Sequence, residues 1–276
     1  MVTLIRLLFV LGSRLPLPLL HGAGVILGWL SFLLSPRYRR RLLANARQAG
    51  MPPGVAWRSV AEAGKLVAEL PRLWLGAPAP VRWDGAEHIE AASAAGRGLL
   101  FLTPHLGCFE ITAQAYAARF GASRPMTVLF RPARKPWLRA LVDHSRERPG
   151  LRTAPTTLSG VRQLVQALKS GEAVGLLPDQ VPPKGLGTWA PFFGREAYTM
   201  TLSARLARSG DTQVLLSWGE RLPWGQGYVV HVRPLAEPLP ADPQAAAAAV
   251  NAAMESLVRE SPAQYLWSYD RYKPPR

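Results

Sequence analysis

The sequence predicts an α/β fold in which a mixed, largely parallel sheet is flanked by helices. Two observations carry this prediction: short apolar runs typical of buried strands, and segments with helical spacing of apolar residues between them. The strands are predicted at residues 98–102, 126–130, 173–177, 213–218 and 228–232, and the helices at 110–120, 136–147, 158–170, 199–209 and 243–260. In a fold of this kind, ligands bind at the carboxyl ends of the strands.

Residues 158–177 illustrate how one helix and the strand after it are predicted. Apolar side chains recur at helical spacing at Leu158, Val161, Leu164, Val165 and Leu168. Gly171 stands where a helix C-cap is expected, and an apolar run then ends at Pro178 and Asp179. Nearer the N-terminus, residues 42–75 are predicted to be helical, and GAPAP at 76–80 to be a connector.

A hydrophobic segment precedes the α/β region. Residues 15–34 contain no Asp, Glu, Lys or Arg and are long enough to cross ~30 Å of hydrocarbon as a helix. RYRRR follows at 37–41, so the positive-inside rule places the bulk of the chain in the cytoplasm. The same pattern suits a helix lying in the membrane interface, and a buried core helix is a further alternative. We therefore predict a membrane anchor with a basic flank over 1–40 and an α/β domain over 41–276.

The composition indicates an anionic partner. Lysine and arginine number 33 against 18 acidic residues, which gives a net charge of +15. Such a balance suits nucleic acid, a phospholipid surface or an acidic protein. Nucleic acid is the least favoured, because the aromatic residues are spread through apolar stretches and the N-terminus is hydrophobic. Cys108 is the only cysteine and the five histidines are scattered, so we expect neither a disulfide nor a metal site.

Ionisable residues follow three of the predicted strands. His105 comes after the first of them, Arg131 after the second and Asp179 after the third. Because the carboxyl ends of parallel strands meet at one edge of a sheet, we expect these residues to converge. The basic residues between 131 and 148 add guanidinium groups that suit phosphate or a developing oxyanion.

His105 and Glu110 are the main candidates for chemistry. Being five residues apart, they would not face each other on one continuous helix. If Gly107 turns the chain, Glu110 lies in the first turns of the next helix and can reach back to the imidazole. Its carboxylate would fix the tautomer and raise the basicity of a histidine that deprotonates a hydroxyl. A helix-capping histidine with an unrelated glutamate is one alternative, and a Cys108–His105 thiol nucleophile is another.

Several blocks of the sequence occur together in one known family. HLGCFE at 105–110 has the form H-x4-(D/E), and FRPARKP at 130–136 is similar to Y-R-P-x-x-N-P. The other blocks are RRRLLANAR at 39–47, GEAVGLLPDQ at 171–180, APFFGREAYT at 190–199 and SPAQYLWSYDRYK at 261–273. In this order they resemble the lipid A biosynthesis (lauroyl/myristoyl) acyltransferase family, within the glycerolipid acyltransferase-like group.

The resemblance implies a membrane-associated enzyme of glycerolipid acyltransferase-like fold. Such an enzyme moves a fatty acyl chain from acyl carrier protein or acyl-CoA to a hydroxyl of a glycolipid similar to a lipid A precursor, without an acyl-enzyme. The implied location is the cytoplasmic face of a bacterial inner membrane, on an anionic surface, and no cofactor is expected. The residues implied are His105 as general base, Glu110 as its orienting carboxylate, and Arg131, Arg146, Asp179 and Gln180 as substrate-binding residues.

Departures from the family pattern leave the acceptor open. The family's Asn-Trp is Cys108-Phe109 here, its Tyr is Phe130 and its Asn is Lys135. A lysophospholipid or a phosphatidylinositol mannoside-like lipid is an alternative acceptor. The alternatives of other classes are a Cys–His thiol hydrolase and a protein that binds anionic lipid without catalysis.

Overall fold

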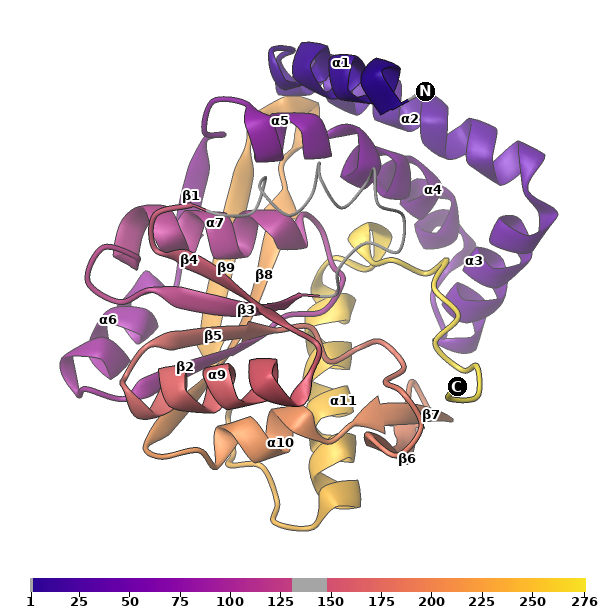
Figure 1. Ribbon diagram of the computed structural model, residues 1–276. Helices are drawn as coiled ribbons and strands as arrows, with labels where there is room; N and C mark the ends of the chain where they lie inside the picture. The colour runs from indigo at the N-terminus through magenta and orange to yellow at the C-terminus, as the bar shows by residue number, and fades with distance from the viewer. Residues whose placement is uncertain (1, 131–147) are drawn as a thin grey trace.

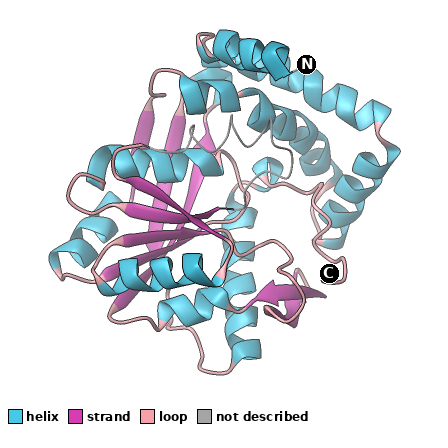
Figure 2. Cartoon of the chain, in the orientation of Figure 1, coloured by secondary structure: helices cyan, strands magenta, loops and turns pink. Residues whose placement is uncertain are grey.

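A mixed sheet forms the centre of the molecule. The computed structural model describes residues 2–130 and 148–276. Within these residues the sheet has seven strands in the order β1-β9-β8-β2-β5-β3-β4. Strands β8, β2, β5, β3 and β4 run parallel to one another, whereas β9 and β1 run the opposite way. The predicted α/β class, with a largely parallel sheet flanked by helices, is confirmed (Figures 1 and 2).

Strands and helices alternate along most of the chain. The strands are β1 (Val81–Asp84), β2 (Gly98–Leu102), β3 (Met126–Phe130), β4 (Leu151–Pro155), β5 (Ala173–Leu176), β6 (Gly187–Phe192), β7 (Arg195–Met200), β8 (Thr212–Arg221) and β9 (Tyr228–Pro234). The helices are α1 (Val2–Ser13), α2 (Leu17–Leu34), α3 (Pro36–Gln48), α4 (Pro53–Ala68), α5 (Leu70–Leu75), α6 (Ala86–Ala94), α7 (Phe109–Phe120), α9 (Leu158–Lys169), α10 (Leu202–Ala207) and α11 (Pro243–Glu260).

The long, strongly patterned elements lie where the sequence predicts them. Strands β2 and β3 and helix α11 have the predicted bounds, and β5, α7 and α9 differ by one residue. Helix α9 begins at a Thr157 N-cap, whose hydroxyl accepts from the backbone N–H of Gly160 (3.3 Å). Strand β8 is longer than predicted, because it pairs with β9 beyond the end of its apolar run.

Most differences between the predicted and the observed secondary structure involve short elements. The helix predicted over 199–209 is wrong at its start, because Tyr198 and Thr199 pair across the β6–β7 hairpin and α10 begins only at Leu202. Strands β1, β4, β6 and β7 and helices α1 and α6 are absent from the prediction. The helix predicted over 136–147 lies outside the described residues.

The two faces of the sheet pack against different helices. In β2, Leu100 and Leu102 belong to the core that includes α9, α10 and α11, whereas Leu99 and Phe101 belong to the core that includes α6 and α7. Alternate residues of a strand point to opposite faces, so both sets are buried. This double burial explains why β2 is a continuous apolar run.

The apolar helix α2 packs tightly along α4. A side chain at Gly64 would overlap the backbone of Gly24 and Gly28, so these glycines allow the two helices to touch. The other side of α2 is exposed at Leu19, Ile26, Leu30, Leu33 and Leu34. By length and composition, α2 qualifies among the described helices as one that could cross a membrane.

The C-terminal tail runs between the strand ends and the N-terminal helices (Figure 1). Asn45 in α3 donates two hydrogen bonds to the tail, to the carbonyls of Trp267 (2.7 Å) and Tyr269 (2.8 Å). The backbone N–H of Leu266 donates to the carbonyl of His105 (3.1 Å). The tail therefore connects α3 to the carboxyl end of β2.

Candidate active site

His105 lies in the loop of residues 103–108 between β2 and α7, which we call the His105 loop. Strands β2 and β5 pair in parallel, with Leu102 opposite Leu176. His105 and Asp179 each follow these partners by three residues. The register of the two strands therefore brings both side chains to the same point at the carboxyl edge of the sheet, as predicted from the order of strands.

Asp179 and Gln180 contact both nitrogens of the His105 ring. Nδ1 of His105 lies 2.6 Å from Oδ1 of Asp179, and the backbone N–H of His105 donates to Oδ2 (2.9 Å). Nε2 of Gln180 lies 3.0 Å from Nε2 of His105. The amide nitrogen is a donor only, so this pattern assigns the lone pair to Nε2 of the imidazole and the proton to Nδ1.

The charge of Asp179 supports this tautomer. Burial raises the pKa of the Asp179 carboxyl, but the charge and hydrogen bonds of His105 and the charge of Arg271 outweigh burial and hold the pKa below its usual value. An ionised carboxylate can only accept, so Nδ1 of His105 donates to it. Nε2 of His105, which carries the lone pair, therefore faces the Gln180 amide.

Two residues of the tail line the far side of Asp179. Arg271 is buried, and its guanidinium donates to the carbonyl of Tyr198 and to Oγ1 of Thr199 (both 2.7 Å). Burial and the Asp179 carboxylate raise the pKa of Tyr265, so its phenol stays protonated. Both residues belong to the block SPAQYLWSYDRYK, which is the signal by which they could have been selected from the sequence.

Glu110 lies in the first turn of α7, as predicted. Its Oε2 lies 3.5 Å from Nε1 of Trp74 in α5. Asp179 hydrogen-bonds the His105 ring through its carboxylate. The family resemblance implied a substrate-binding role for Asp179 instead. The register of β2 and β5, which places Asp179 beside His105, explains why the structure differs from that expectation. The orienting role of Glu110 stays a prediction.

Arg131 and Arg146 lie outside the described residues. Their predicted place in the site is therefore a prediction still. Among the described residues, no group of three or more His, Cys, Asp or Glu side chains is arranged to hold a metal ion.

Cys108 is a packing residue rather than an exposed thiol. Its side chain is fully buried, and burial raises the pKa of the thiol well above its usual value, with the Glu69 carboxylate acting in the same direction. A nucleophilic cysteine needs an accessible thiolate. The geometry of Cys108 therefore does not fit the thiol-hydrolase alternative.

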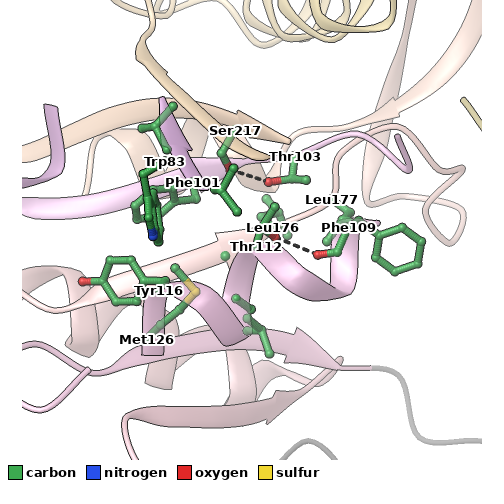
Figure 3. Close-up of a pocket in the computed structure, with 15 residues that line it drawn as sticks. Trp83, Phe101, Thr103, Phe109, Thr112, Tyr116, Met126, Leu176, Leu177 and Ser217 are labelled. Carbon is green, nitrogen blue, oxygen red and sulfur yellow. Dashed lines mark hydrogen bonds between the residues drawn. The ribbon is translucent and has the colours of Figure 1, made fainter. Parts of the chain in front are cut away.

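An apolar cavity of about 40 Å³ begins beside the His105 loop, between α7 and the sheet (Figure 3). Phe109 lines the cavity and also meets the His105 ring edge to face, with 4.8 Å between ring centroids. Thr103 and Ser217 line it with hydroxyls paired at 2.8 Å. The remaining lining is mostly apolar and includes Phe101, Tyr116, Met126, Val128, Gly175 and Leu176.

Comparisons with known proteins find similarity to lipid A biosynthesis acyltransferases. The chain is 28% identical over 215 residues to the lipid A biosynthesis palmitoleoyltransferase of Escherichia coli (strain K12), which is 76% of this chain and 68% of that protein. It is 30% identical over 199 residues to the lipid A biosynthesis lauroyltransferase of the same organism, covering 70% of this chain and 62% of the relative. A lipid A biosynthesis acyltransferase of Haemophilus influenzae is 26% identical over 183 residues, covering 66% of this chain and 56% of the relative.

The pattern of one protein family runs through nearly all of the chain. The model of the bacterial lipid A biosynthesis acyltransferases matches residues 15–274. Those residues include α2, the His105–Asp179 pair and the C-terminal tail. The chain therefore belongs to the bacterial lipid A biosynthesis acyltransferase family.

Proposed function

We propose that this O-acyltransferase moves a fatty acyl chain from acyl carrier protein or acyl-CoA to a hydroxyl of a lipid A precursor, with His105 as the general base. The observation that carries the proposal is the hydrogen-bonded series Asp179, His105 and Gln180 beside an apolar cavity. Relatives named palmitoleoyltransferase and lauroyltransferase support a long acyl chain as the transferred group.

Nε2 of His105 removes the proton of the acceptor hydroxyl. That hydroxyl takes the position on Nε2 that the Gln180 amide occupies 3.0 Å away. The oxygen attacks the thioester carbonyl, a C–O bond forms, and the C–S bond then breaks. The departing thiolate takes the proton from the imidazolium, which Asp179 stabilises through Nδ1. Glu110, Arg131 and Arg146 remain predicted partners of the base, the acceptor or the developing oxyanion.

The apolar cavity is suited to the acyl chain of the donor. Phe109, which lines the cavity, also contacts the His105 ring, so an acyl chain in the cavity would have its thioester carbonyl near the base. A volume of about 40 Å³ admits only a few methylene groups, so a long chain requires its lining side chains to move. Met126 is one such side chain, since methionine is unbranched and adapts its shape easily.

The exposed side of α2 is suited to the membrane interface rather than to a span. Its other side packs on α4, which carries Arg58, Glu62 and Lys65. A bilayer-spanning α2 would draw these charged groups into hydrocarbon, at a large cost in free energy. Leu30, Leu33 and neighbouring side chains instead insert into the membrane interface. The protein then stays on the cytoplasmic face, where the arginines of α3 contact anionic head groups.

Vesicle flotation tests this membrane contact. Leu30→Glu and Leu33→Glu should each reduce binding to vesicles of phosphatidylglycerol and phosphatidylethanolamine, because a carboxylate opposes insertion. Leu158→Glu is the control, since Leu158 is an exposed leucine on α9, away from α2. Equal loss in all three variants, or in none, would contradict the assignment to α2.

Acyl transfer itself is tested with the purified protein. Mass spectrometry of a lipid A precursor incubated with acyl carrier protein thioester, or with acyl-CoA, should reveal a product heavier by one acyl group. Parallel reactions with a lysophospholipid and a phosphatidylinositol mannoside examine the alternative acceptors. Salt-sensitive lipid binding without any acylated product would support the binding-only alternative and overturn the proposal.

Cys108→Ser separates the acyltransferase from a thiol hydrolase. A hydrolase that uses the Cys108 thiol must lose its activity in this variant. The proposed mechanism forms no acyl-enzyme, so its rate of acyl transfer should be retained. Loss of transfer in a folded Cys108→Ser protein would favour the hydrolase.

A further inference from the structure

A buried ion-pair network lies beneath the His105 loop and takes no part in the chemistry proposed above. Arg221, the last residue of β8, places its guanidinium between two glutamates. Its Nε and Nη2 lie 2.9 and 2.6 Å from the two carboxylate oxygens of Glu69, and Nη1 lies 2.7 Å from Oε2 of Glu62. The side chains of Arg221 and Glu69 are 1% and 0% exposed.

Both partners of the central pair are charged. Burial raises the pKa of Glu69, but the charge and hydrogen bonds of Arg221 and His21 outweigh burial and bring the pKa to about 2. Burial lowers the pKa of Arg221, but Glu69 and Glu62 reverse that effect and raise it well above its usual value. The network is therefore a set of fixed charges at neutral pH.

The same guanidinium contacts the His105 loop. Nη2 of Arg221 donates to the carbonyl of Gly107 (3.2 Å), two residues after His105. Gly107 has φ +59, and an added side chain there would overlap the carbonyl oxygen of Gly219. The Gln264 side chain supports this contact by fixing the backbone of Arg221. Its Oε1 accepts from the Arg221 N–H (2.9 Å), and its Nε2 donates to the Arg221 carbonyl (3.0 Å).

Hydrogen bonds engage each backbone amide from His105 to Cys108. The His105 amide donates to the Asp179 carboxylate (2.9 Å) and the Leu106 amide to the Pro104 carbonyl (2.7 Å). The Gly107 amide donates to the Gln264 carbonyl (3.0 Å) and the Cys108 amide to the Gly219 carbonyl (2.8 Å). A shift of the Gly107 carbonyl would therefore disturb the bonds that place His105.

A gain in core stability does not by itself explain why this network is ionic. A buried ion pair must offset the cost of removing two charges from water, and apolar side chains of similar volume are often as stable or more so. Apolar side chains cannot, however, donate a hydrogen bond to the Gly107 carbonyl. The feature that needs Arg221 is therefore the loop and not the core.

We propose that Arg221 is a positioning residue for the His105 base, holding the Gly107 carbonyl so that the His105 loop keeps its shape. Glu69 and Glu62 aim the guanidinium at that carbonyl. The proposal rests on the proposed function of His105, since it assigns Arg221 no contact with substrate.

The network also connects the loop to the apolar helix α2. Oε2 of Glu69 lies 3.2 Å from Nε2 of His21 in α2, and the Tyr228 hydroxyl donates to the same oxygen (2.9 Å). One buried carboxylate thus joins α2, the sheet and the guanidinium that holds the Gly107 carbonyl.

The test compares two variants with a control of matched stability. Glu69→Leu/Arg221→Met removes both charges together, so that no buried charge is left unpaired. Arg221→Lys keeps a charge for Glu69 but lacks the planar fork that reaches Glu69 and Gly107 at once. Leu164→Ala, which truncates a buried core side chain of α9, is the control for a general loss of stability.

Amide hydrogen exchange and steady-state kinetics are measured on the full chain. In the double variant we expect faster exchange at residues 105–108 and a fall in kcat of about 10²-fold, with the KM for the acyl donor unchanged. Arg221→Lys should lower kcat by a smaller factor. Leu164→Ala should retain its kcat at a comparable loss in Tm.

Wild-type exchange at 105–108 and wild-type kcat in either folded variant would overturn the proposal. If the double variant does not fold, Arg221→Lys alone decides the outcome by the same two readouts. Exchange is measured without substrate, so it tests the position of the loop even if the wild-type protein transfers no acyl group. The two proposals can therefore fail separately.

Discussion

Asp179 determines which nitrogen of His105 can act as a base. Its buried carboxylate accepts hydrogen bonds from the backbone N–H and the Nδ1–H of His105, and these bonds and the charge of Arg271 favour its ionised form. Nε2 is then available to a hydroxyl. At the scale of single residues, the proposed chemistry depends on this one hydrogen bond of 2.6 Å.

Asp179→Asn should slow acyl transfer by ~10²–10⁴-fold, because a neutral amide neither enforces the tautomer nor stabilises the imidazolium. The initial rate with a lipid A precursor is the measurement, and circular dichroism checks the fold. Asp242→Asn is the matched control, since it exchanges one good N-cap of α11 for another. An Asp179→Asn rate equal to that of the control would contradict the role assigned to this carboxylate.

His105 could be selected from sequence because it directly follows an apolar strand and begins a recognisable block. The hydrogen bond between Asp179 and the His105 ring could not be predicted from sequence. It depends on the register of β5 against β2, two strands that are more than 70 residues apart in the chain. Arg221 and Glu69 were missed for a similar reason. A charged residue at the end of an apolar run looks solvated until the fold buries it.

The elements around the cavity determine its size. Strands of the sheet, including β2, β3 and β5, line one side of it and α7 the other, so in the proposed function single side chains on these elements would set how much of an acyl chain it accepts. The cavity is narrow at Gly175 in β5. A Cβ added there would lie 3.0 Å from Cγ1 of Val128 and 3.5 Å from Sδ of Met126.

Gly175→Ala and Met126→Ala should change the acyl preference in opposite directions. The added methyl at 175 shortens the chain that is transferred, and truncation at 126 leaves a larger cavity that favours longer chains. Competition between acyl donors of different length, with products measured by mass spectrometry, gives the ratio. Gly54→Ala is the control, since an added methyl there meets nothing within 4 Å. The same chain-length distribution in all variants would place the acyl chain elsewhere.

Elements with a long apolar pattern were predictable to within a residue or so, as β2, β3 and α11 illustrate. Strands β1 and β4 were not, because each is an edge strand of only four or five residues, and a pattern that short does not distinguish a strand from a loop. The β6–β7 hairpin depends on its turn, where Phe193 and Gly194 both have positive φ. A phenylalanine in that conformation is not a turn signal in sequence.

At the scale of the whole molecule, α2, the sheet and the Arg221 network meet at the carboxylate of Glu69. Its carboxyl has a pKa lowered from 4.5 to about 2 on folding. The ionised form therefore stabilises the folded chain above pH 4.5, and that contribution is lost as the pH falls toward 2. The size of the contribution is roughly 3 kcal/mol.

Glu69→Gln should lower the free energy of unfolding at neutral pH and flatten its decline below pH 4.5, because the titrating group is gone. Denaturant unfolding at a series of pH values measures both effects. The exposed Glu237→Gln should leave the pH profile unchanged. A Glu69→Gln profile parallel to that of the wild type would mean that this carboxyl is not the one that titrates.

At the scale of the whole chain, the alternation of apolar runs with segments of helical spacing was enough to predict the fold class, and the order of the sequence blocks was enough to predict the family. The packing of α2 on α4 was not predictable, because it requires Gly24, Gly28 and Gly64 to meet across two helices. A hydrophobic segment gives the same sequence pattern whether it spans a bilayer or lies against the protein.

The initial rate of acyl transfer by folded His105→Ala protein tests the central claim most directly. The account predicts a fall of ~10²–10⁴-fold, because the acceptor hydroxyl loses its base while the cavity and the membrane contact remain. An undiminished rate would contradict the assignment of His105, and with it the mechanism built on the Asp179–His105 pair.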